Sequence, residues 1–307
     1  MSRIKHGLTY LGITVIRLLA MLPLRVQFRL GGLLGRLTYH LAPHRRHIAE
    51  TNVRLCFPEL DDSAQQALVR DIFRSTGISA METAMAWFND PEKYRSRVTV
   101  EGLENLQAAQ AQDKGVLLIG AHFSTLDLAG CLVALFADFD VMYKRSKNPV
   151  IEASMRKGRE RHFGAVIERR DTRQVMRRLR QGRTIWYAAD QDYGPQHSVF
   201  APFFGQQAAT IVAASRLARI NDSPALLISH FRDERTCTWS LRFSPIIEGF
   251  PSGDDIQDAT RINAMIEAEI RRHPEQYLWL HRRFKTRPNG EQKPYRKKRR
   301  KQRREAA

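Results

Sequence analysis

The sequence predicts an α/β protein with a mostly parallel sheet flanked by helices, preceded by an N-terminal membrane-anchoring helix. Three observations support this fold class. Short apolar runs alternate with helical segments from residue 116 onward, residues 45–95 look helical throughout, and residues 8–24 are almost uniformly apolar. Strands separated by helices pair in parallel and are covered on both faces. A chain of 307 residues, 43% of them hydrophobic, can bury a sizeable core.

The N-terminal stretch 8–24 would reach about 26 Å as a helix, slightly short of a bilayer core. Arg17 near its middle opposes insertion, and a buried soluble helix is the alternative. A cleavable signal peptide is disfavoured because no small-residue cleavage site follows. We expect residues 1–30 to form a hydrophobic anchor that spans the membrane or lies in its interface. Arginines downstream of this stretch place the main domain, 31–288, on the cytoplasmic side.

The alternating elements follow in order through the middle of the chain. Residues 116–120 (VLLIG) form an apolar run bounded by polar residues, which is typical of a buried strand. Gly182 provides a stop for the helix before it. By the same criteria we expect strands at 116–120, 140–143, 164–168, 184–189, 225–231 and 237–243, and helices at 125–136, 150–163, 173–180, 208–219 and 258–272.

The charge of the chain is unevenly distributed. The net charge is +18, and residues 285–307 contain eleven basic and two acidic residues, so half of the excess lies in this segment. We expect residues 289–307 to be a disordered basic tail. Such a run binds nucleic acid or anionic lipid and does not discriminate between them.

Composition excludes several other classes. Cys56, Cys131 and Cys237 are far apart and form no CxxC pair, which excludes a disulfide scaffold and a thiolate zinc cluster. The mean hydropathy of −0.43 excludes a multi-span membrane protein. No glycine-rich phosphate loop is present, and we expect neither a metal nor a cofactor.

His122 and Asp127 follow the strand 116–120 in the run GAHFSTLD. Ligands of open α/β sheets bind beyond the carboxyl ends of strands, where His122 is expected. A histidine there can act as a general base if a carboxylate, here Asp127, orients the ring. The alternative is structural, with Asp127 favoured only by the dipole of the helix that it begins. The spacing itself occurs as often as chance predicts.

GAHFSTLD after an apolar strand resembles the His-x-x-x-x-Asp block of the lysophospholipid acyltransferase superfamily. Four longer blocks make the chain similar to the late acyltransferases of lipid A biosynthesis, the lauroyl and myristoyl transferases. They are RRHIAETNVRLCFPEL (45–60), IERRDTRQVMRRLRQG (167–182), YAADQDYGPQHSVFAPFFG (187–205) and HPEQYLWLHRRFKTRP (273–288), with a Tyr143-Lys144-Arg145 turn. The similarity covers about residues 8–288 and excludes the tail.

This resemblance implies transfer of a fatty acyl chain from an acyl carrier protein thioester to a hydroxyl of a 3-hydroxyacyl chain on a Kdo-bearing lipid A precursor. His122 would take the hydroxyl proton while Asp127 orients the ring, and no covalent acyl-enzyme is needed. Ser124 lacks a Gly-x-Ser-x-Gly elbow and suits a helix cap better than a nucleophile. The implied location is the inner membrane, with the catalytic domain facing the cytoplasm and contacting anionic lipid.

Arginines near the strand ends suit the acidic groups of such substrates. Guanidinium groups bind phosphate and carboxylate in bidentate fashion, so we expect Arg145, Arg159 and Arg169 to bind substrate. Solvated helix faces are the alternative for about half of the arginines in this region. Asp190 ends the fourth strand, and the superfamily resemblance implies a role in acceptor binding; loop capping is its structural alternative.

Three functions therefore remain. The first is a membrane-bound lipid A acyltransferase, and the second is an acyltransferase that uses a glycerophospholipid or another glycolipid acceptor. The third is a non-enzymatic basic protein that binds a membrane or nucleic acid through its tail. The coherent site around His122 favours an enzyme, and we expect no nucleic-acid partner.

Overall fold

The computed structural model describes residues 2–288, 291 and 294–295. Its centre is a seven-stranded sheet in the order β1-β9-β8-β2-β5-β3-β4. The strands are β1 (Val98–Glu101), β2 (Val116–Gly120), β3 (Asp140–Tyr143), β4 (Val166–Glu168), β5 (Thr184–Ala188), β8 (Ala225–Asp233) and β9 (Thr238–Phe243). Five adjacent strands from β8 to β4 run parallel, and β9 joins β8 in antiparallel pairing. The predicted mostly parallel α/β sheet is confirmed.

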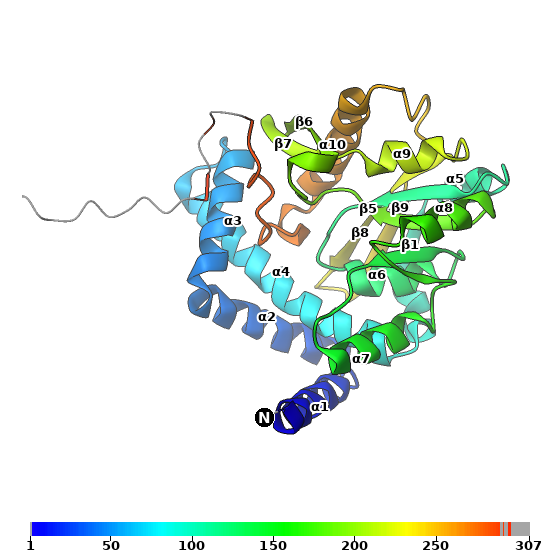
Figure 1. Cartoon of the computed structure of the whole chain (residues 1–307). Coiled ribbons are helices and arrows are strands. Elements are labelled where there is room, and N and C mark those ends of the chain that lie inside the picture. The colour runs from blue at the N-terminus through cyan, green and yellow to red at the C-terminus, as the bar shows by residue number, and fades with distance from the viewer. Residues whose placement is uncertain (1, 289–290, 292–293, 296–307) are drawn as a thin grey trace, which may run out of the picture.

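Helices cover both faces of this sheet (Figure 1). Alternate residues of β2 show why: Leu117 and Ile119 belong to one buried cluster, and Val116 and Leu118 belong to the other. The first cluster includes residues of α8 (Thr172–Arg180), α9 (Ala213–Arg219) and α10 (Asp255–Arg272), and the second includes residues of α5 (Leu103–Gln110) and α6 (Leu126–Val133). The helix α7 (Pro149–Arg159) follows β3.

The first third of the chain forms a separate helical layer beside the sheet. It consists of α1 (Ser2–Leu19), α2 (Leu24–Leu41), α3 (Pro43–Cys56) and α4 (Asp62–Phe88), followed by the short 3-10 helix η1 (Pro91–Arg97). The long helix α4 contributes Phe73 to one core cluster and Ile78 to the other. It therefore joins the helical layer to both sides of the sheet.

The expectation of one apolar helix over residues 8–24 is wrong. The first helix ends at Leu19, and Pro23 stands at the start of α2. Proline lacks the N–H that a continuing helix needs, so it favours a new helix start over continuation. Within the described part of the chain, every helix is too short or too polar to cross a bilayer.

The helices α2 and α4 touch through their backbones. A Cβ added to Gly35 would lie 2.2 Å from the carbonyl oxygen of Phe73, and one added to Gly77 would lie 2.1 Å from that of Gly31. No side chain fits in that space. These glycines therefore set the close packing of α2 on α4.

Two other predicted segments differ in detail. Residues 208–211, expected to begin a helix, belong to β7 (Gln206–Ile211), which pairs antiparallel with β6 (Ser198–Phe203) before α9 begins at Ala213. The predicted tail 289–307 lies mostly outside the described residues. Tyr295, however, accepts a hydrogen bond from the backbone N–H of Phe284 and donates one to Asn52, so contact with the domain continues to this residue.

Candidate active site

The site forms where β2 and β5 end side by side. These strands pair in parallel with Gly120 opposite Ala188. His122 lies two residues beyond the first, and Asp190 lies two residues beyond the second. Because paired parallel strands end at the same edge of a sheet, this register brings the two side chains together.

Asp190 is the carboxylate that contacts the imidazole. Its Oδ1 lies 2.6 Å from Nδ1 of His122, and its Oδ2 accepts the backbone N–H of His122 at 2.9 Å. The hydroxyl of Tyr277 donates a third hydrogen bond to the same carboxylate. Asp190 is only 2% exposed, so these donors take the place of water around its carboxylate. Nδ1 is thereby occupied, and Nε2 is the basic nitrogen of the neutral ring.

The electrostatics of the pair favour a charged histidine. Burial alone would lower the pKa of His122, but the charge of Asp190 and its hydrogen bond outweigh burial and raise the pKa above the ordinary value of 6.5. Burial would raise the pKa of Asp190, whereas the charge and hydrogen bonds of His122 lower it well below its usual range. The site therefore stabilises an imidazolium next to an ionised carboxylate.

Asp127, predicted to orient His122, has other partners. Its Oδ1 accepts a hydrogen bond from Arg159 at 2.6 Å, and its Oδ2 accepts one from the hydroxyl of Thr83 at 3.1 Å. Asp127 is the second residue of α6, and it acts on the pKa of His122 through its charge. The contact assigned to Asp127 from the sequence belongs to Asp190.

His122, Asp127 and Arg159 meet at one cavity of about 100 Å³. The rest of its lining is almost entirely apolar: Leu126, Gly130, Val141, Met142, Phe163, Trp186 and Ala188. Arg159, at the end of α7, is the predicted substrate-binding arginine that the structure brings to His122. An imidazole, an ion pair and an apolar recess thus share one space.

The other predicted arginines lie elsewhere. Arg145 is exposed and lines a separate polar pocket of about 340 Å³, together with Glu152, Arg156 and Glu168. The guanidinium of Arg169 stacks over the ring of Tyr193, with 5.5 Å to its centroid. Neither lines the cavity at His122. Among the described residues, no group of three or more His, Cys, Asp or Glu is placed to hold a metal ion.

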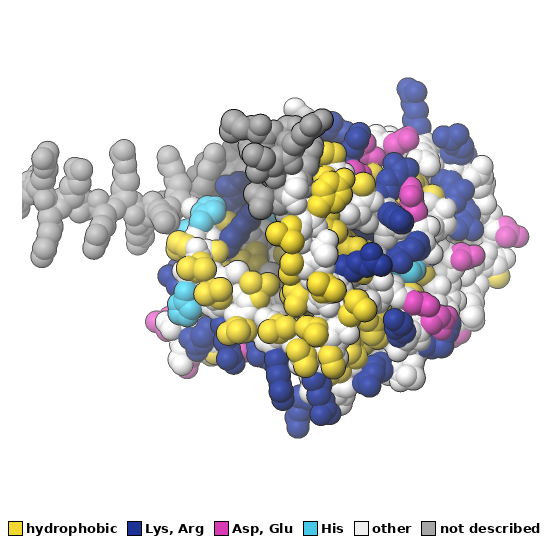
Figure 2. Space-filling model, turned by 90° about the horizontal axis from the view of Figure 1, so that it is seen from below, with side chains coloured by type: hydrophobic (Ala, Val, Ile, Leu, Met, Phe, Trp, Pro, Cys, Tyr) yellow, Lys and Arg dark blue, Asp and Glu magenta, His cyan; other side chains and the backbone are white. Residues whose placement is uncertain are grey.

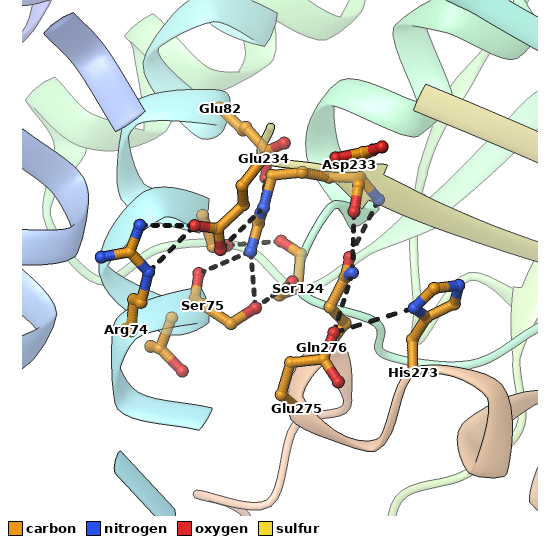
Figure 3. Close-up of polar contacts among 12 residues, drawn as sticks. Arg74, Ser75, Glu82, Ser124, Asp233, Glu234, His273, Glu275 and Gln276 are labelled. Atoms are coloured by element: carbon orange, nitrogen blue, oxygen red, sulfur yellow. Dashed lines mark hydrogen bonds and ion pairs between the residues drawn. The ribbon is translucent and has the colours of Figure 1, made fainter. Parts of the chain in front are cut away.

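The loop that carries His122 is fixed from two sides. From the C-terminal segment, the carbonyl of Gln276 accepts the N–H of Ser124 at 2.6 Å, and Leu278 donates its N–H to the carbonyl of His122 at 3.1 Å. From α4, the hydroxyls of Ser75 and Ser124 lie 2.9 Å apart (Figure 3). Ser124 therefore supports the loop through Ser75; the predicted helix-cap role is wrong, because Thr125 stands at the cap position of α6 and the hydroxyl of Ser124 contacts Ser75.

A buried ion pair stands behind this support. Arg232 donates to Glu82 at 2.7 Å and to the hydroxyl of Ser75 at 2.6 Å, and the indole N–H of Trp239 donates to the other oxygen of Glu82 at 2.7 Å. Figure 3 shows Glu82 and Ser75 on α4 facing the end of β8. Burial raises the pKa of Glu82 even though Arg232 opposes this effect.

Three supports of the site were not predicted from the sequence: the Asp190–His122 contact, the Tyr277 hydroxyl and Ser75 of α4. The first could have been found by noting that the strands 116–120 and 184–188 end with polar residues at equal offsets. The other two depend on contacts between segments that are about 50 and 150 residues apart in the chain, and no local sequence pattern predicts such contacts.

Comparison with known proteins places this geometry in a family. Residues 1–286 match the family model described as bacterial lipid A biosynthesis acyltransferase. The chain is 38% identical over 292 residues to the lipid A biosynthesis palmitoleoyltransferase of Escherichia coli (strain K12), with 95% of each chain covered. It is 37% identical over 287 residues to the lauroyltransferase of the same organism, covering 93% of this chain and 94% of the relative. The myristoyltransferase is 28% identical over 291 residues, covering 94% and 90%. The chain therefore belongs to the bacterial lipid A biosynthesis acyltransferase family and is an acyltransferase.

Proposed function

We propose that this enzyme transfers a fatty acyl chain from an acyl carrier protein thioester to the hydroxyl of a 3-hydroxyacyl chain on a Kdo-bearing lipid A precursor, at the cytoplasmic face of the inner membrane. One observation carries the proposal: the ring of His122 is fixed at Nδ1 by buried Asp190 and lines an apolar cavity that also holds Arg159. A base beside an apolar recess suits a hydroxyl on a fatty chain.

The chemistry follows from this arrangement. Nε2 of His122 takes the proton of the acceptor hydroxyl while the hydroxyl oxygen attacks the thioester carbonyl carbon. The tetrahedral intermediate collapses, the carbon–sulfur bond breaks, and the thiolate leaves with the proton that His122 held. Asp190 supports the imidazolium between these steps because its carboxylate contacts Nδ1 at 2.6 Å. Acyl group and proton balance without a covalent enzyme intermediate.

Arg159 and Asp127 act as a pair in this proposal. Asp127 anchors the guanidinium at 2.6 Å, and both residues line the cavity. A guanidinium has further N–H donors that can approach the developing oxyanion or an acidic group of the substrate. Asp127 then positions Arg159, and Asp190 orients the base. Arg145 and Arg169 are assigned to the acidic headgroup or carrier on the surface beyond the cavity.

The helix α2 supports a membrane-facing surface. Its buried residues, such as Gly31 and Gly35, face α4. A second stripe is exposed and apolar: Val26, Leu30, Leu33, Leu34, Leu37 and Leu41. A third stripe, Arg25, Arg29 and Arg36, lies beside it at helical spacing.

This apolar stripe continues onto α1, where Tyr10, Leu11, Val15, Ile16 and Leu18 are also exposed. Figure 2 shows the resulting hydrophobic surface on the face where α1 and α2 lie, with Lys and Arg around it. An apolar face edged by basic residues binds anionic lipid in the plane of the interface. Of the two arrangements predicted for the anchor, spanning or interfacial, we therefore propose the interfacial one, formed by both helices.

Reconstituted transfer tests the enzymatic proposal. Purified protein is given acyl carrier protein loaded with a palmitoleoyl, lauroyl or myristoyl chain, and Kdo-bearing lipid A precursor in mixed micelles. Mass spectrometry should show one added acyl chain, which His122→Ala should abolish while the protein stays folded. Lysophosphatidic acid is offered in a parallel arm. Acylation of that acceptor alone would establish the alternative glycerophospholipid function and refute the proposed acceptor.

Vesicle flotation tests the surface. Leu33→Glu with Leu37→Glu should move the protein from anionic vesicles to the soluble fraction. The matched control is Ile256→Glu on α10, where the side chain is 54% exposed but lies far from α2 in the fold. Equal flotation of the double variant and the wild type would refute an interfacial role for α2.

A further inference from the structure

His230 is a second buried histidine beside the active-site loop, and the chemistry above leaves it without a role. It lies on β8, which pairs with β2 on the side opposite β5. Its side chain is fully buried. Its Nδ1 lies 2.7 Å from the hydroxyl of Thr125, the residue three positions after His122.

The protons of this contact can be assigned. The hydroxyl of Thr125 also donates to the backbone carbonyl of His230 at 3.1 Å, and a carbonyl can only accept. Because a hydroxyl has one proton, that proton is used in this bond. Nδ1 of His230 is then the donor to the Thr125 oxygen, which fixes the ring as the neutral tautomer with its lone pair on Nε2.

The side chain of Thr125 makes these bonds instead of capping the helix. It stands immediately before α6, where a threonine hydroxyl commonly caps the first N–H groups of the helix, yet its side chain makes no such bond. Thr125 is fully buried and both of its polar contacts go to His230. The direction of α6, which carries Asp127, is thus tied to β8.

The surroundings keep His230 uncharged. Burial and, to a smaller extent, the charge of nearby His122 lower its pKa to about 3, against a smaller opposite effect of Asp190. When His122 takes up a proton, His230 stays neutral and the Thr125 contact is preserved. The hydrogen bond between His230 and Thr125 therefore does not change with the protonation state of His122.

The indole of Trp186 closes the far side of His230. Its ring centroid lies 5.6 Å from that of His230 at an angle of 60°. The indole can lie there because Gly120 has no side chain: a Cβ at that residue would come within 2.3 Å of Nε1 of Trp186. Trp186 also lines the cavity at His122, so His230 is packed between the loop and the cavity wall.

We propose that His230 is a positioning residue for the acyl transfer: as a neutral ring it donates from Nδ1 to Thr125, and this bond sets where the loop presents His122 and where α6 presents Asp127. The inference rests on the proposed function for its activity readout. His230 itself does not reach the reacting atoms. Its loss changes the rate of the chemical step and leaves substrate binding nearly unchanged.

Two amides distinguish this role from general packing. In His230→Asn the side-chain amide nitrogen takes the place of Nδ1 and can still donate to Thr125. In His230→Gln the side chain is one methylene longer, so its amide nitrogen no longer lies at the position of Nδ1. We expect Asn to keep kcat within about threefold of wild type. We expect Gln to lower kcat about 100-fold, the effect of a displacement near 1 Å, with KM within about threefold.

Variants of Thr125 provide the same comparison from the other side. Thr125→Ser keeps the hydroxyl and should retain kcat, whereas isosteric Thr125→Val should lose as much as His230→Gln. The double variant Thr125→Val/His230→Gln should be no worse than either single change, because both remove one contact. Ile228→Ala, which creates a cavity on the same strand, controls for destabilisation and should lower the melting temperature without changing kcat.

Hydrogen exchange measured by mass spectrometry provides a readout that does not depend on any substrate. Peptides over residues 121–128 should exchange faster in His230→Gln and Thr125→Val than in wild type, and at the wild-type rate in His230→Asn. Equal losses of kcat in Asn and Gln, or wild-type kcat and exchange in Thr125→Val, would overturn the proposal. A wild-type protein inactive on every acceptor, with the exchange pattern as expected, would instead refute the proposed function alone.

Discussion

Replacing Asp190 by asparagine tests which carboxylate serves His122. Asp190 accepts hydrogen bonds from Nδ1 of His122 at 2.6 Å, from the backbone N–H of His122 at 2.9 Å and from the hydroxyl of Tyr277. Asparagine has one acceptor oxygen in place of two. If that oxygen keeps the backbone N–H, its NH₂ group faces Nδ1 and favours the tautomer whose Nε2 is protonated and cannot accept a proton.

The expected loss can be estimated from these contacts. A misoriented general base costs about 10²–10⁴-fold in kcat, with little effect on KM. The buried charged hydrogen bonds contribute about 1.5–3 kcal/mol each, so Asp190→Asn should also lower the free energy of unfolding by about 2 kcal/mol or more. The loss of kcat far exceeds what partial unfolding would produce, and it is measured with saturating donor and acceptor.

The pH dependence gives the second signature. In the wild type, kcat/KM should rise with pH through the raised pKa of His122, because only the neutral ring accepts a proton. Asp190→Asn removes the charge that raises this pKa while burial remains. The rise of kcat/KM should therefore occur at lower pH. The pair stabilises the fold most between the ordinary pKa values of aspartate, 3.8, and histidine, 6.5, so destabilisation should be larger at pH 5.5 than at pH 8.5.

Asp127→Asn is the matched comparison. It keeps the hydrogen bond from Thr83 and weakens the ion pair with Arg159. We therefore expect it mainly to raise KM and to leave the pH at which kcat/KM rises nearly unchanged. The role of Asp190 would be refuted if Asp127→Asn lowered kcat about 10³-fold and shifted the pH at which kcat/KM rises, while Asp190→Asn changed neither quantity. In that case His122 would pair with Asp127 during turnover.

Three further predictions concern neighbouring features. Arg159→Lys should raise KM more than it lowers kcat in the transfer assay, because lysine cannot bind Asp127 and a substrate oxygen together in the same planar geometry; an unchanged KM would argue against substrate contact. Gly35→Ala should destabilise the protein by about 1–3 kcal/mol in chemical denaturation. Gly12→Ala, with open space around its Cβ, should not, and equal effects would refute the close-packing argument. Glu82→Gln should lower the free energy of unfolding by about 3 kcal/mol, because buried Arg232 then keeps only its longer ion pair with Glu234, at 3.7 Å; a melting temperature equal to wild type would contradict this.

Much of the fold followed from local pattern. The strands 116–120 and 140–143 have the predicted bounds. The first is a continuous apolar run, which is typical of a buried parallel strand, whereas the second begins with the buried charged residue Asp140. The strand 206–211 was missed because QQAATI has small and polar residues that also suit a helix, and only its pairing with β6 decides the outcome. Pro23 was a local signal for a helix boundary within the apolar run, and hydrophobicity alone obscured it.

The site was predicted less completely than the fold. The location of His122 at the end of a strand followed from the sheet itself, as did the polar position of Asp190 at the end of its neighbour. Which of two carboxylates contacts the ring depends on the register between β2 and β5 and on Arg159 engaging Asp127. Both are tertiary facts, because spacing along the chain places Asp127 near His122 without fixing its side-chain partner.

The hydrogen bonds between the His122 loop and residues 276–278 affect when the site can form during translation. The ribosome makes the N-terminal helices first, whereas Gln276 and Leu278, which bond to Ser124 and His122, are made almost last. The loop therefore cannot be fixed until nearly the whole chain has emerged. A nascent chain with α1 and α2 already formed has no completed site, and a product that stops before residue 276 should remain inactive even where its sheet has formed.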